Sequence, residues 1–278
     1  MQNKLSVVSL NMFGTPFHPK RILTTFFRNQ VRKRFSAIAE IIYSLDTDVL
    51  LLQEVHDYPH LLFLKRLLPK FPYLVYKPML YGPRGGLVIF SKYPLETDHF
   101  YDFLTKGKLH NKSITGHLSM KGILQAKIKG TNIWVANTHL TQNSDHDFSP
   151  DNRYIPILLA QLKQVAIHIQ AMKERGEQVI LGGDFNMPKD TEYYKDFLKI
   201  TDLKDTFPRD SFTTYHQNFL PEGESIGRVD YIFTSRSVLP LSTTYILRKP
   251  LKDDEGNPFF PSDHMGLVAT YMLKDYTK

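Results

Sequence analysis

The sequence contains no cysteine and only one tryptophan. The lack of cysteine excludes disulfide scaffolds, zinc sites built on thiolates and cysteine nucleophiles. It does not indicate a compartment, because a chain without thiols is compatible with reducing and oxidising surroundings alike. Serine catalysis of the G-x-S-x-G type is not indicated either, and no P-loop or dinucleotide fingerprint occurs, since YGPRGG lacks both the spacing and the following helix.

Long apolar runs are absent as well. No run approaches the ~20 residues that a membrane-spanning helix needs. The opening MQNKLSVVSLNMFG leads directly into a predicted strand, without the apolar stretch of a secretory signal. We therefore expect a soluble chain, either cytoplasmic or secreted after removal of a leader.

The charge balance favours an anionic partner without identifying it. Lys and Arg number 35 against 28 Asp and Glu, which gives a formal net charge of +7. Nucleic acid, an anionic membrane and a phosphorylated metabolite would all be attracted to such a chain. A moderate excess spread over the whole sequence is equally typical of plain solubility.

Strand-like and helix-like patterns alternate along the 278 residues. Apolar residues at helical spacing predict long helices over 31–45 and 155–175 and shorter ones in LLFLKRLL and TEYYKDFLKI. Buried-strand patterns occur in DVLLLQEV, GGLVIFSKYPL and QVILGGDF, and ILQAKIKGTNIWVANTHL is typical of two strands joined by a polar turn. Because no linker or repeat divides the chain, we predict a single α/β domain over residues 1–278, with two sheets inside and helices outside.

Almost every predicted strand ends in, or begins with, a polar side chain. The set comprises Asn11, Glu54, His139, Asp184, Asn186, Asp230, Asp263 and His264. Ligand sites in layered α/β proteins lie at strand ends, so the repetition carries more weight than any one residue. Each residue also has an ordinary alternative as a turn former, a capping residue or a satisfied core histidine. Glu54 fits such an alternative least well, because a carboxylate at the buried end of VLLLQ needs a partner or a metal.

The chemistry of this set is coherent. Oxygen ligands such as Glu54, Asn11, Asp184 and Asp263, with no thiolate available, suit Mg²⁺ or Mn²⁺ better than zinc. Such a cation neutralises phosphate oxygens and stabilises a leaving alkoxide, while two histidines and an aspartate handle protons and the charge that develops at phosphorus.

Seven motifs occur in the order LNMFG, DVLLLQEV, GGLVIFSKYPL, NTHL, GGDFN, RVDYIF and SDH, over nearly the whole chain. In this order the sequence resembles the endonuclease/exonuclease/phosphatase superfamily, which includes pancreatic deoxyribonuclease, abasic-site repair endonucleases, inositol-polyphosphate phosphatases and neutral sphingomyelinases. The resemblance implies a four-layer α/β sandwich, in which two packed mixed β-sheets are flanked by helices. It also implies metal-dependent cleavage of phosphate esters by in-line attack of an activated water.

The resemblance further implies a metal site. Glu54 would be the principal metal ligand, Asn11 would bind the metal or the phosphate, and Asp263 would make a second metal contact. The cofactor would be Mg²⁺, with Mn²⁺ or another divalent cation as the alternative.

Proton and phosphate handling are implied for the remaining motif residues. Asp184 would orient or deprotonate the attacking water, and Asn186 would hold the phosphate beside it. His139 would stabilise the pentacoordinate phosphorane. His264 would act from the opposite side as acid–base or charge stabiliser, oriented by Asp230.

Two features bear on the substrate. The segment before RVDYIF has no tryptophan, and the only one, Trp134, lies in a predicted strand, which argues against the abasic-site endonucleases. TTY in that segment and MKGILQAKI around Lys121 resemble the sphingomyelinase branch, in which a lysine in this neighbourhood is linked to phosphate or lipid handling. A solvated lysine at a turn is the equal alternative for Lys121.

A lipid substrate requires contact with a membrane. RILTTFFRNQVRKRF and EGNPFFPSDH mix basic and aromatic residues as an interfacial surface does, although the same rings also suit packing on a sheet or stacking of bases. We expect a phosphodiesterase of the phospholipase C or sphingomyelinase type, with a DNA or RNA nuclease or a phosphomonoesterase as the alternative. The expected partners are a phosphate-ester substrate and a phospholipid surface, with nucleic acid less favoured, and the expected state is a monomer. A binding protein without turnover is disfavoured, because every catalytic position is filled by the expected residue type.

Overall fold

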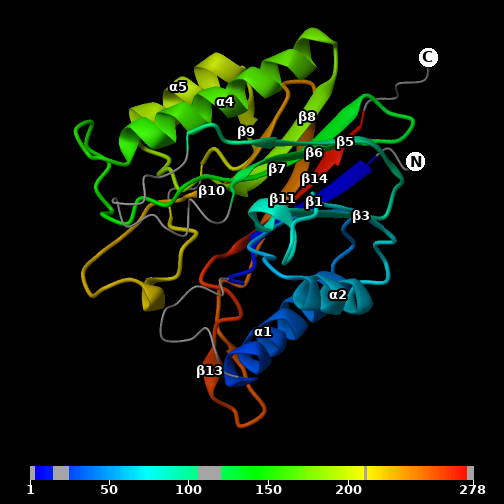
Figure 1. The fold of residues 1–278 in the computed structure, drawn as a ribbon, viewed down its shortest axis with the longest axis vertical. Helices are drawn as coiled ribbons and strands as arrows, with labels where there is room; N and C mark the ends of the chain where they lie inside the picture. Colours follow the sequence, from blue (N-terminus) through cyan, green and yellow to red (C-terminus); the bar gives the residue numbers. More distant parts are fainter. Residues whose placement is uncertain (1–3, 15–24, 106–119, 210–211, 274–278) are drawn as a thin grey trace.

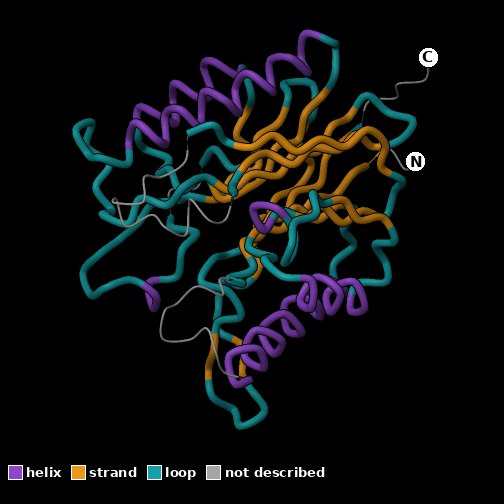
Figure 2. The backbone as a smooth tube through the Cα atoms, in the orientation of Figure 1, coloured by secondary structure: helices purple, strands orange, loops and turns teal. Residues whose placement is uncertain are grey.

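Two six-stranded mixed β-sheets form the centre of the molecule, and helices cover their outer faces (Figure 1, Figure 2). The computed structural model describes residues 4–14, 25–105, 120–209 and 212–273, and in the first helix it describes the side chains from residue 30 onward. The expected architecture, two packed mixed sheets flanked by helices, is confirmed.

The first sheet has the strand order β11-β14-β1-β2-β4-β3. Its strands are β1 Lys4–Asn11, β2 Val49–Gln53, β3 Tyr73–Val75, β4 Val88–Ser91, β11 Leu239–Ile246 and β14 Gly266–Met272. β1 and β2 pair in parallel, which requires a crossover. α1 (Thr25–Ser44) lies in this connection, and with α2 (Tyr58–Leu67) it covers the outer face of the sheet.

The second sheet has the strand order β5-β6-β7-β8-β10-β9. Its strands are β5 Leu95–Asp102, β6 Gly122–Ile128, β7 Ile133–His139, β8 Gln178–Asp184, β9 Lys204–Asp205 and β10 Asp230–Thr234. β7 and β8 are parallel, and α4 (Ile155–Glu174) forms their crossover. α4 and α5 (Glu192–Thr201) cover this sheet, and a small hairpin of β12 (Leu251–Lys252) and β13 (Pro258–Phe259) lies apart from it (Figure 1).

The predicted helices form because their apolar stripes face the sheets. In α1, Val31, Phe35, Ile38 and Ile42 are fully buried in the core between helix and first sheet. The ring of Phe35 therefore packs on the sheet. For this ring, the structure agrees with sheet packing, one of the alternatives stated for the basic-aromatic segment. Arg21 and the side chains of 25–29 in the same segment lie outside the described residues.

α4 is the one helix in the described ranges that is long and apolar enough, by length and composition, to cross a membrane. Half of its apolar window is buried inside the fold, where residues such as Leu162, Val165 and Ile169 pack against the second sheet. Its bounds agree with the helix predicted over 155–175, but by length and composition it meets the membrane-spanning criterion that no apolar run of the sequence was expected to approach. Its contacts are those of a core helix, whose apolar face is covered by the sheet.

Several strands carry no clear pattern in the sequence. β11 is an edge strand whose first six residues are exposed, so its side chains do not alternate between core and solvent. β9, β12 and β13 have two residues each, too few for any periodicity. The core between the two sheets also contains a polar pair, Gln53 and Asn137, whose side chains hydrogen-bond at 2.7 Å.

Candidate active site

The strand ends named in the sequence meet at one edge of the two sheets. In the second sheet, the register places Asp184 opposite both His139 on β7 and Asp230 on β10. In the first sheet, Asn11 is paired with Gln53 at the end of β2. Parallel neighbours end at the same edge of a sheet, so the crossover topology brings these groups together.

Asn11 links the two sheets at this edge. Its amide Nδ2 donates to Glu54 Oε1 at 3.3 Å and to Asp184 Oδ2 at 3.1 Å, while its Oδ1 accepts from the backbone N–H of Phe13 at 3.0 Å. Asn11 and Asp184 are each 1% exposed. One amide thus fixes a carboxylate of each sheet relative to the other.

His264 is held between carboxylates. Its Nδ1 lies 2.8 Å from Asp230 Oδ2, an oxygen that also accepts from the Thr214 hydroxyl at 2.6 Å, and its Nε2 lies 3.7 Å from Asp184 Oδ2. Burial disfavours the charged ring, but the carboxylates of Asp230, Asp184 and Asp263 outweigh burial and raise the pKa of His264 well above the ordinary value. The three carboxylates therefore favour the imidazolium form of the ring.

His139 lies on the other side of the same carboxylate, with Nε2 3.4 Å from Asp184 Oδ2. Burial, reinforced by the positive charge of Lys121 and by His56 and His264, lowers the pKa of His139 well below the ordinary value. One carboxylate oxygen thus lies near two imidazoles, one with a lowered pKa and one with a raised pKa.

Two buried carboxylates of this edge, Asp184 and Asp263, have raised pKa values. Burial raises the pKa of Asp184 to about 6, and Asp230 adds to the rise, while His264 and Lys121 oppose it. Burial raises the pKa of Asp263 to about 7, and Glu54 adds to that rise. Raised pKa values at both Asp184 and Asp263 indicate that nearby positive charge does not fully compensate these carboxylates. As oxygen donors with no thiolate among them, they fit a hard divalent cation.

Among the described residues, Asp184, Asp230 and His264 form a group whose ligand atoms all lie within 4.8 Å of one another. In this group the Nδ1 of His264 is already hydrogen-bonded to Asp230. Glu54 stands outside the group and is connected to it through Asn11. The geometry thus distinguishes a hydrogen-bonded carboxylate–imidazole group from the oxygen donors near Glu54.

The backbone around the site is strained at two non-glycine residues. Glu54 has φ +62° and Asn186 has φ +48°, both in the left-handed region. Such conformations concentrate at functional sites, because the surrounding structure must hold them in place. Next to Glu54, Gly86 allows a close approach: a Cβ there would lie 2.7 Å from the ring of His56 and 3.0 Å from the Glu54 Cα.

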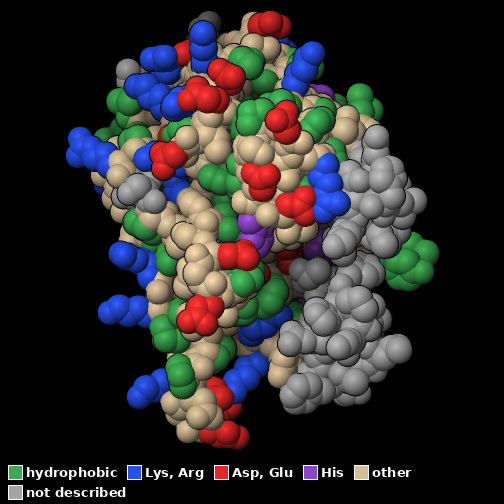
Figure 3. Space-filling model, turned by 90° about the vertical axis from the view of Figure 1, so that its left-hand side faces the viewer, with side chains coloured by type: hydrophobic (Ala, Val, Ile, Leu, Met, Phe, Trp, Pro, Cys, Tyr) green, Lys and Arg blue, Asp and Glu red, His purple; other side chains and the backbone are tan. Residues whose placement is uncertain are grey.

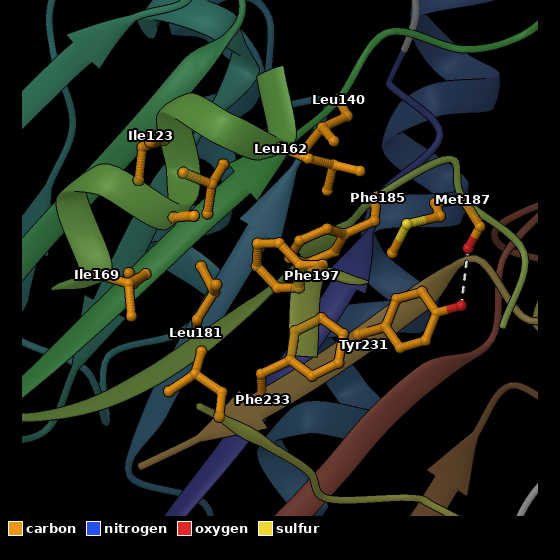
Figure 4. Packing of buried hydrophobic residues seen from close by; sticks show 14 of the residues in the cluster. Ile123, Leu140, Leu162, Ile169, Leu181, Phe185, Met187, Phe197, Tyr231 and Phe233 are labelled. Atoms are coloured by element: carbon orange, nitrogen blue, oxygen red, sulfur yellow. Dashed lines mark hydrogen bonds between the residues drawn. The ribbon is translucent and has the colours of Figure 1, made fainter. Parts of the chain in front are cut away.

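The loop after β8 is fixed by hydrogen bonds at both ends. The backbone N–H of Asn186 donates to Asp184 Oδ1 at 2.9 Å, and its side-chain amide donates to the carbonyl of Leu140 at 3.0 Å. The Tyr231 hydroxyl donates to the Met187 carbonyl at 2.7 Å, and its ring packs in the core beneath (Figure 4). One of the two amide hydrogens of Asn186 is thus used within the protein.

Lys121 is buried and faces the site. It is 8% exposed, and its ammonium donates to the Leu140 carbonyl at 2.6 Å. Burial lowers the pKa of Lys121 to about 8, although Asp184 and Glu54 oppose that fall. The alternative of a solvated turn lysine is therefore wrong, because the side chain is enclosed.

Several residues of the site were not identified from the sequence. His56 lies beside Glu54 and Lys121, and burial lowers its pKa. The Ser262 hydroxyl donates to the Asn11 carbonyl at 2.7 Å and accepts from the His264 N–H at 3.0 Å. His56 directly follows the motif DVLLLQEV, and Ser262 is the first residue of the motif SDH. Only the fold shows what each of these two residues contacts.

An aromatic ridge, defined as Phe13, Tyr215, Phe219 and Phe260, extends from the site toward the surface. The Tyr215 ring stands edge-on to His264 with centroids 4.9 Å apart, and Phe219 lies 6.5 Å from both Tyr215 and Phe260 and 5.4 Å from Phe13. Phe219 is 38% exposed. Arg34 adds a cation over Phe13 at 4.5 Å.

The structure brings every predicted site residue to this one region. Their catalytic and metal-binding roles stay predictions. The face on the left of Figure 1 is turned toward the viewer in Figure 3, where histidine and acidic side chains appear together near the middle of the surface.

A sequence profile described as the Endonuclease/Exonuclease/phosphatase family matches residues 8–264. The chain belongs to this family. The match spans the motifs from β1 to His264, and it confirms the resemblance expected from them.

Two relatives share part of the sequence. A Staphylococcus aureus phospholipase C is 28% identical over 165 residues, which cover 55% of this chain and 46% of the relative. A Drosophila melanogaster putative neutral sphingomyelinase is 26% identical over 290 aligned positions, which cover 97% of this chain and 61% of the relative. The chain thus matches about half to three fifths of the length of these relatives.

Solved structures share the fold. Sphingomyelinase C from Streptomyces griseocarneus superposes with a TM-score of 0.71 at 19% identity, over 96% of this chain and 99% of that one. Truncated TDP2 from Caenorhabditis elegans superposes with a TM-score of 0.68 at 20% identity, over 97% of both chains. At these identities the likeness bears on the fold alone.

Proposed function

We propose that this protein is a divalent-metal-dependent phosphodiesterase of the phospholipase C type, acting on a phospholipid or sphingolipid head group. The observation that carries the proposal is the pair of histidines at Asp184 Oδ2, His139 at 3.4 Å with a lowered pKa and His264 at 3.7 Å with a raised pKa. A buried carboxylate between a neutral and a charged imidazole provides both a proton acceptor and a proton donor at neutral pH.

Glu54, Asn11 and Asp263 would hold the cation, which when bound neutralises phosphate charge and stabilises the leaving oxygen. Glu54 adds to the raised pKa of Asp263, so a cation would stabilise both carboxylates in their charged form. A metal contact by Asn11 would use the amide oxygen Oδ1, which also accepts from the Phe13 N–H. Mg²⁺ is the first candidate, because these ligands are oxygens of a compact site. Lys121 provides a fixed positive charge nearby.

The remaining residues handle the water and the leaving group. Asp184 accepts a proton from the attacking water, whose oxygen forms a new bond to phosphorus. The bond from phosphorus to the lipid oxygen breaks, and the imidazolium of His264 gives its Nε2 proton to that oxygen. The products are a lipid alcohol and a phosphomonoester. Asp230 keeps His264 charged and oriented through the 2.8 Å contact at Nδ1, while the second amide hydrogen of Asn186 binds a phosphate oxygen.

A lipid substrate is supported by the names of the two relatives and by the aromatic ridge beside His264. The ridge leads from His264 to the exposed ring of Phe219. It therefore offers apolar surface to a lipid whose head group lies beside His264 and Asp184. We further propose that residues 1–278 form one catalytic domain, because the core between the sheets is shared by both of them.

A substrate panel tests the proposal. Bis-p-nitrophenyl phosphate, plasmid DNA, phosphatidylcholine vesicles and sphingomyelin vesicles are each incubated with Mg²⁺, with and without a chelator. We expect hydrolysis of vesicles that the chelator abolishes. His264→Ala and Asp184→Asn should each lower turnover at least about a hundredfold. His146→Ala is the matched control, because this histidine pairs with Glu224 in an exposed contact. Chelator-insensitive hydrolysis would contradict the metal, and a preference for DNA would contradict the lipid substrate.

A further inference from the structure

A pocket of about 330 Å³ lies on the outer face of the second sheet, between α4 and the strands β5 and β6. Trp134 lines it near the start of β7, five residues before His139 at the end of that strand. Five residues of strand span roughly 17 Å, and side chains an odd number of positions apart face opposite sides of the sheet. The pocket is therefore separate from the catalytic edge.

Two ring pairs form much of the pocket lining. His99 is stacked with Trp134 at 6.0 Å and 14°, and Tyr101 is stacked with His168 at 3.9 Å and 24°. These pairs present flat aromatic surfaces on the sheet and on the helix. Aromatic faces of this kind favour a planar ligand that stacks on them.

Two donors in the pocket lining have no partner. Gln125 and Trp134 are each 3% exposed, and neither Gln125 Nε2 nor Trp134 Nε1 has a hydrogen-bond partner within the part of the chain that the structure describes. An indole N–H can only donate, so rotating a side-chain amide elsewhere would not satisfy it. Buried donors are paired in most proteins, because leaving one unpaired costs free energy. A ligand for this pocket would therefore bring acceptor atoms to its aromatic surface.

Two cations share one carboxylate in the pocket lining. Glu177 lies 2.8 Å from Arg175 and 3.8 Å from Lys127, so these three side chains carry a net positive charge. The contact with Lys127 is loose and leaves its ammonium available to a second anion. Net positive charge, flat aromatic rings and unpaired hydrogen-bond donors thus occur together in the lining of one pocket.

We propose that this pocket is a second ligand site that binds a planar ring with hydrogen-bond acceptors and an attached phosphate, the chemistry of a nucleoside monophosphate. The base stacks on Tyr101 and on the exposed ring of His99, which is stacked with Trp134, and its acceptors are directed toward the donors of Gln125 and Trp134. The phosphate binds Lys127 and Arg175. A volume of about 330 Å³ is within the range of small-molecule sites and leaves room for a single nucleotide.

Fluorescence tests the proposal directly, because Trp134 is the only tryptophan of the chain and lines the pocket. The wild-type protein is titrated with adenosine monophosphate, adenosine and inorganic phosphate, each with a chelator present to suppress binding at the catalytic edge. We expect a saturable change with adenosine monophosphate, and at least about tenfold weaker binding of adenosine and of phosphate, since each lacks half of the contacts. No saturable change, or phosphate alone binding as tightly as the nucleotide, would overturn the proposal.

Variants locate the binding. Gln125→Leu removes a donor at similar volume and should weaken binding of adenosine monophosphate about tenfold. Lys127→Met should weaken it by a similar factor, whereas Lys129→Met, an exposed lysine two residues along, should not. Asp184→Asn should leave binding unchanged. Equal affinity in Gln125→Leu and Lys127→Met, or loss in Asp184→Asn, would place the nucleotide elsewhere and refute the site. Melting temperatures confirm that each variant is folded.

Discussion

The contact between Asp230 and His264 gives the sharpest prediction about the catalytic edge. Asp230→Asn keeps the size of the side chain and removes its charge. Asp230 is 1% exposed, and its Oδ2 accepts from His264 Nδ1 at 2.8 Å and from the Thr214 hydroxyl at 2.6 Å. The substitution therefore replaces a charge-assisted hydrogen bond by a neutral one, with little change in packing.

The expected fall in turnover follows from the strength of the hydrogen bond between Asp230 and His264. A hydrogen bond to a charged group contributes about 1.5–3 kcal/mol, which corresponds to a fall in turnover of about 10- to 150-fold if the whole contact acts in the transition state. Thr214→Val removes the hydroxyl that donates to the same oxygen and keeps the Asp230 charge, and it also removes the acceptor of the Val229 and Asp230 backbone N–H groups. Because that hydroxyl acts on His264 only through Asp230, whose charge remains, turnover should fall about tenfold or less.

The assay measures kcat and KM for sphingomyelin vesicles and for bis-p-nitrophenyl phosphate, beside the melting temperature of each variant. We expect the fall in kcat to be similar for both substrates, because Asp230 acts on His264 and not on the lipid. A fall of less than twofold in Asp230→Asn, or a larger loss in Thr214→Val than in Asp230→Asn, would refute the role of this carboxylate.

Further predictions concern stability and charge. Arg228→Met removes one partner of a fully buried ion pair with Asp205 and should lower the free energy of unfolding by about 3–5 kcal/mol. Lys195→Met, in an exposed pair with Glu192, should change it far less. Urea unfolding measures both variants, and equal effects would contradict the burial argument. Lys121→Met removes the buried ammonium beside the site and should lower kcat/KM about tenfold or more, with a smaller loss in exposed Lys129→Met; unchanged kcat/KM in the first variant would show that Lys121 is structural.

The layered fold could be predicted from the sequence where burial imposes a period. α1, α4 and the fully buried β2 and β8 follow directly from their patterns, because one face or both faces of each element lie in a core. β11 could not be predicted, since six of its eight residues are exposed and its place is set by pairing with β14. Strand order and register depend on contacts between distant segments, which no local pattern encodes.

The site residues could be predicted because strands of the two sheets end at a common edge. The contacts between them could not. Asn11 and Asp184 are separated by 173 positions, and the hydrogen bond between their side chains depends on how the two sheets pack. The burial of Lys121 was likewise invisible, since its neighbours MKGIL are typical of a turn as well as of a strand. His56 lacked a signal for the same reason: its position is set by the close approach at Gly86.

The central claim is that Glu54, Asn11 and Asp263 bind a divalent cation beside the carboxylate–imidazole group. Anomalous scattering from crystals grown with Mn²⁺ tests it most directly, with Glu54→Gln as the comparison. The account predicts a single strong peak at about 2.1 Å from a Glu54 carboxylate oxygen in the wild type, and its loss in the variant. A peak bonded instead to Asp184, Asp230 and His264, or a peak near residue 54 that survives the substitution, would contradict it.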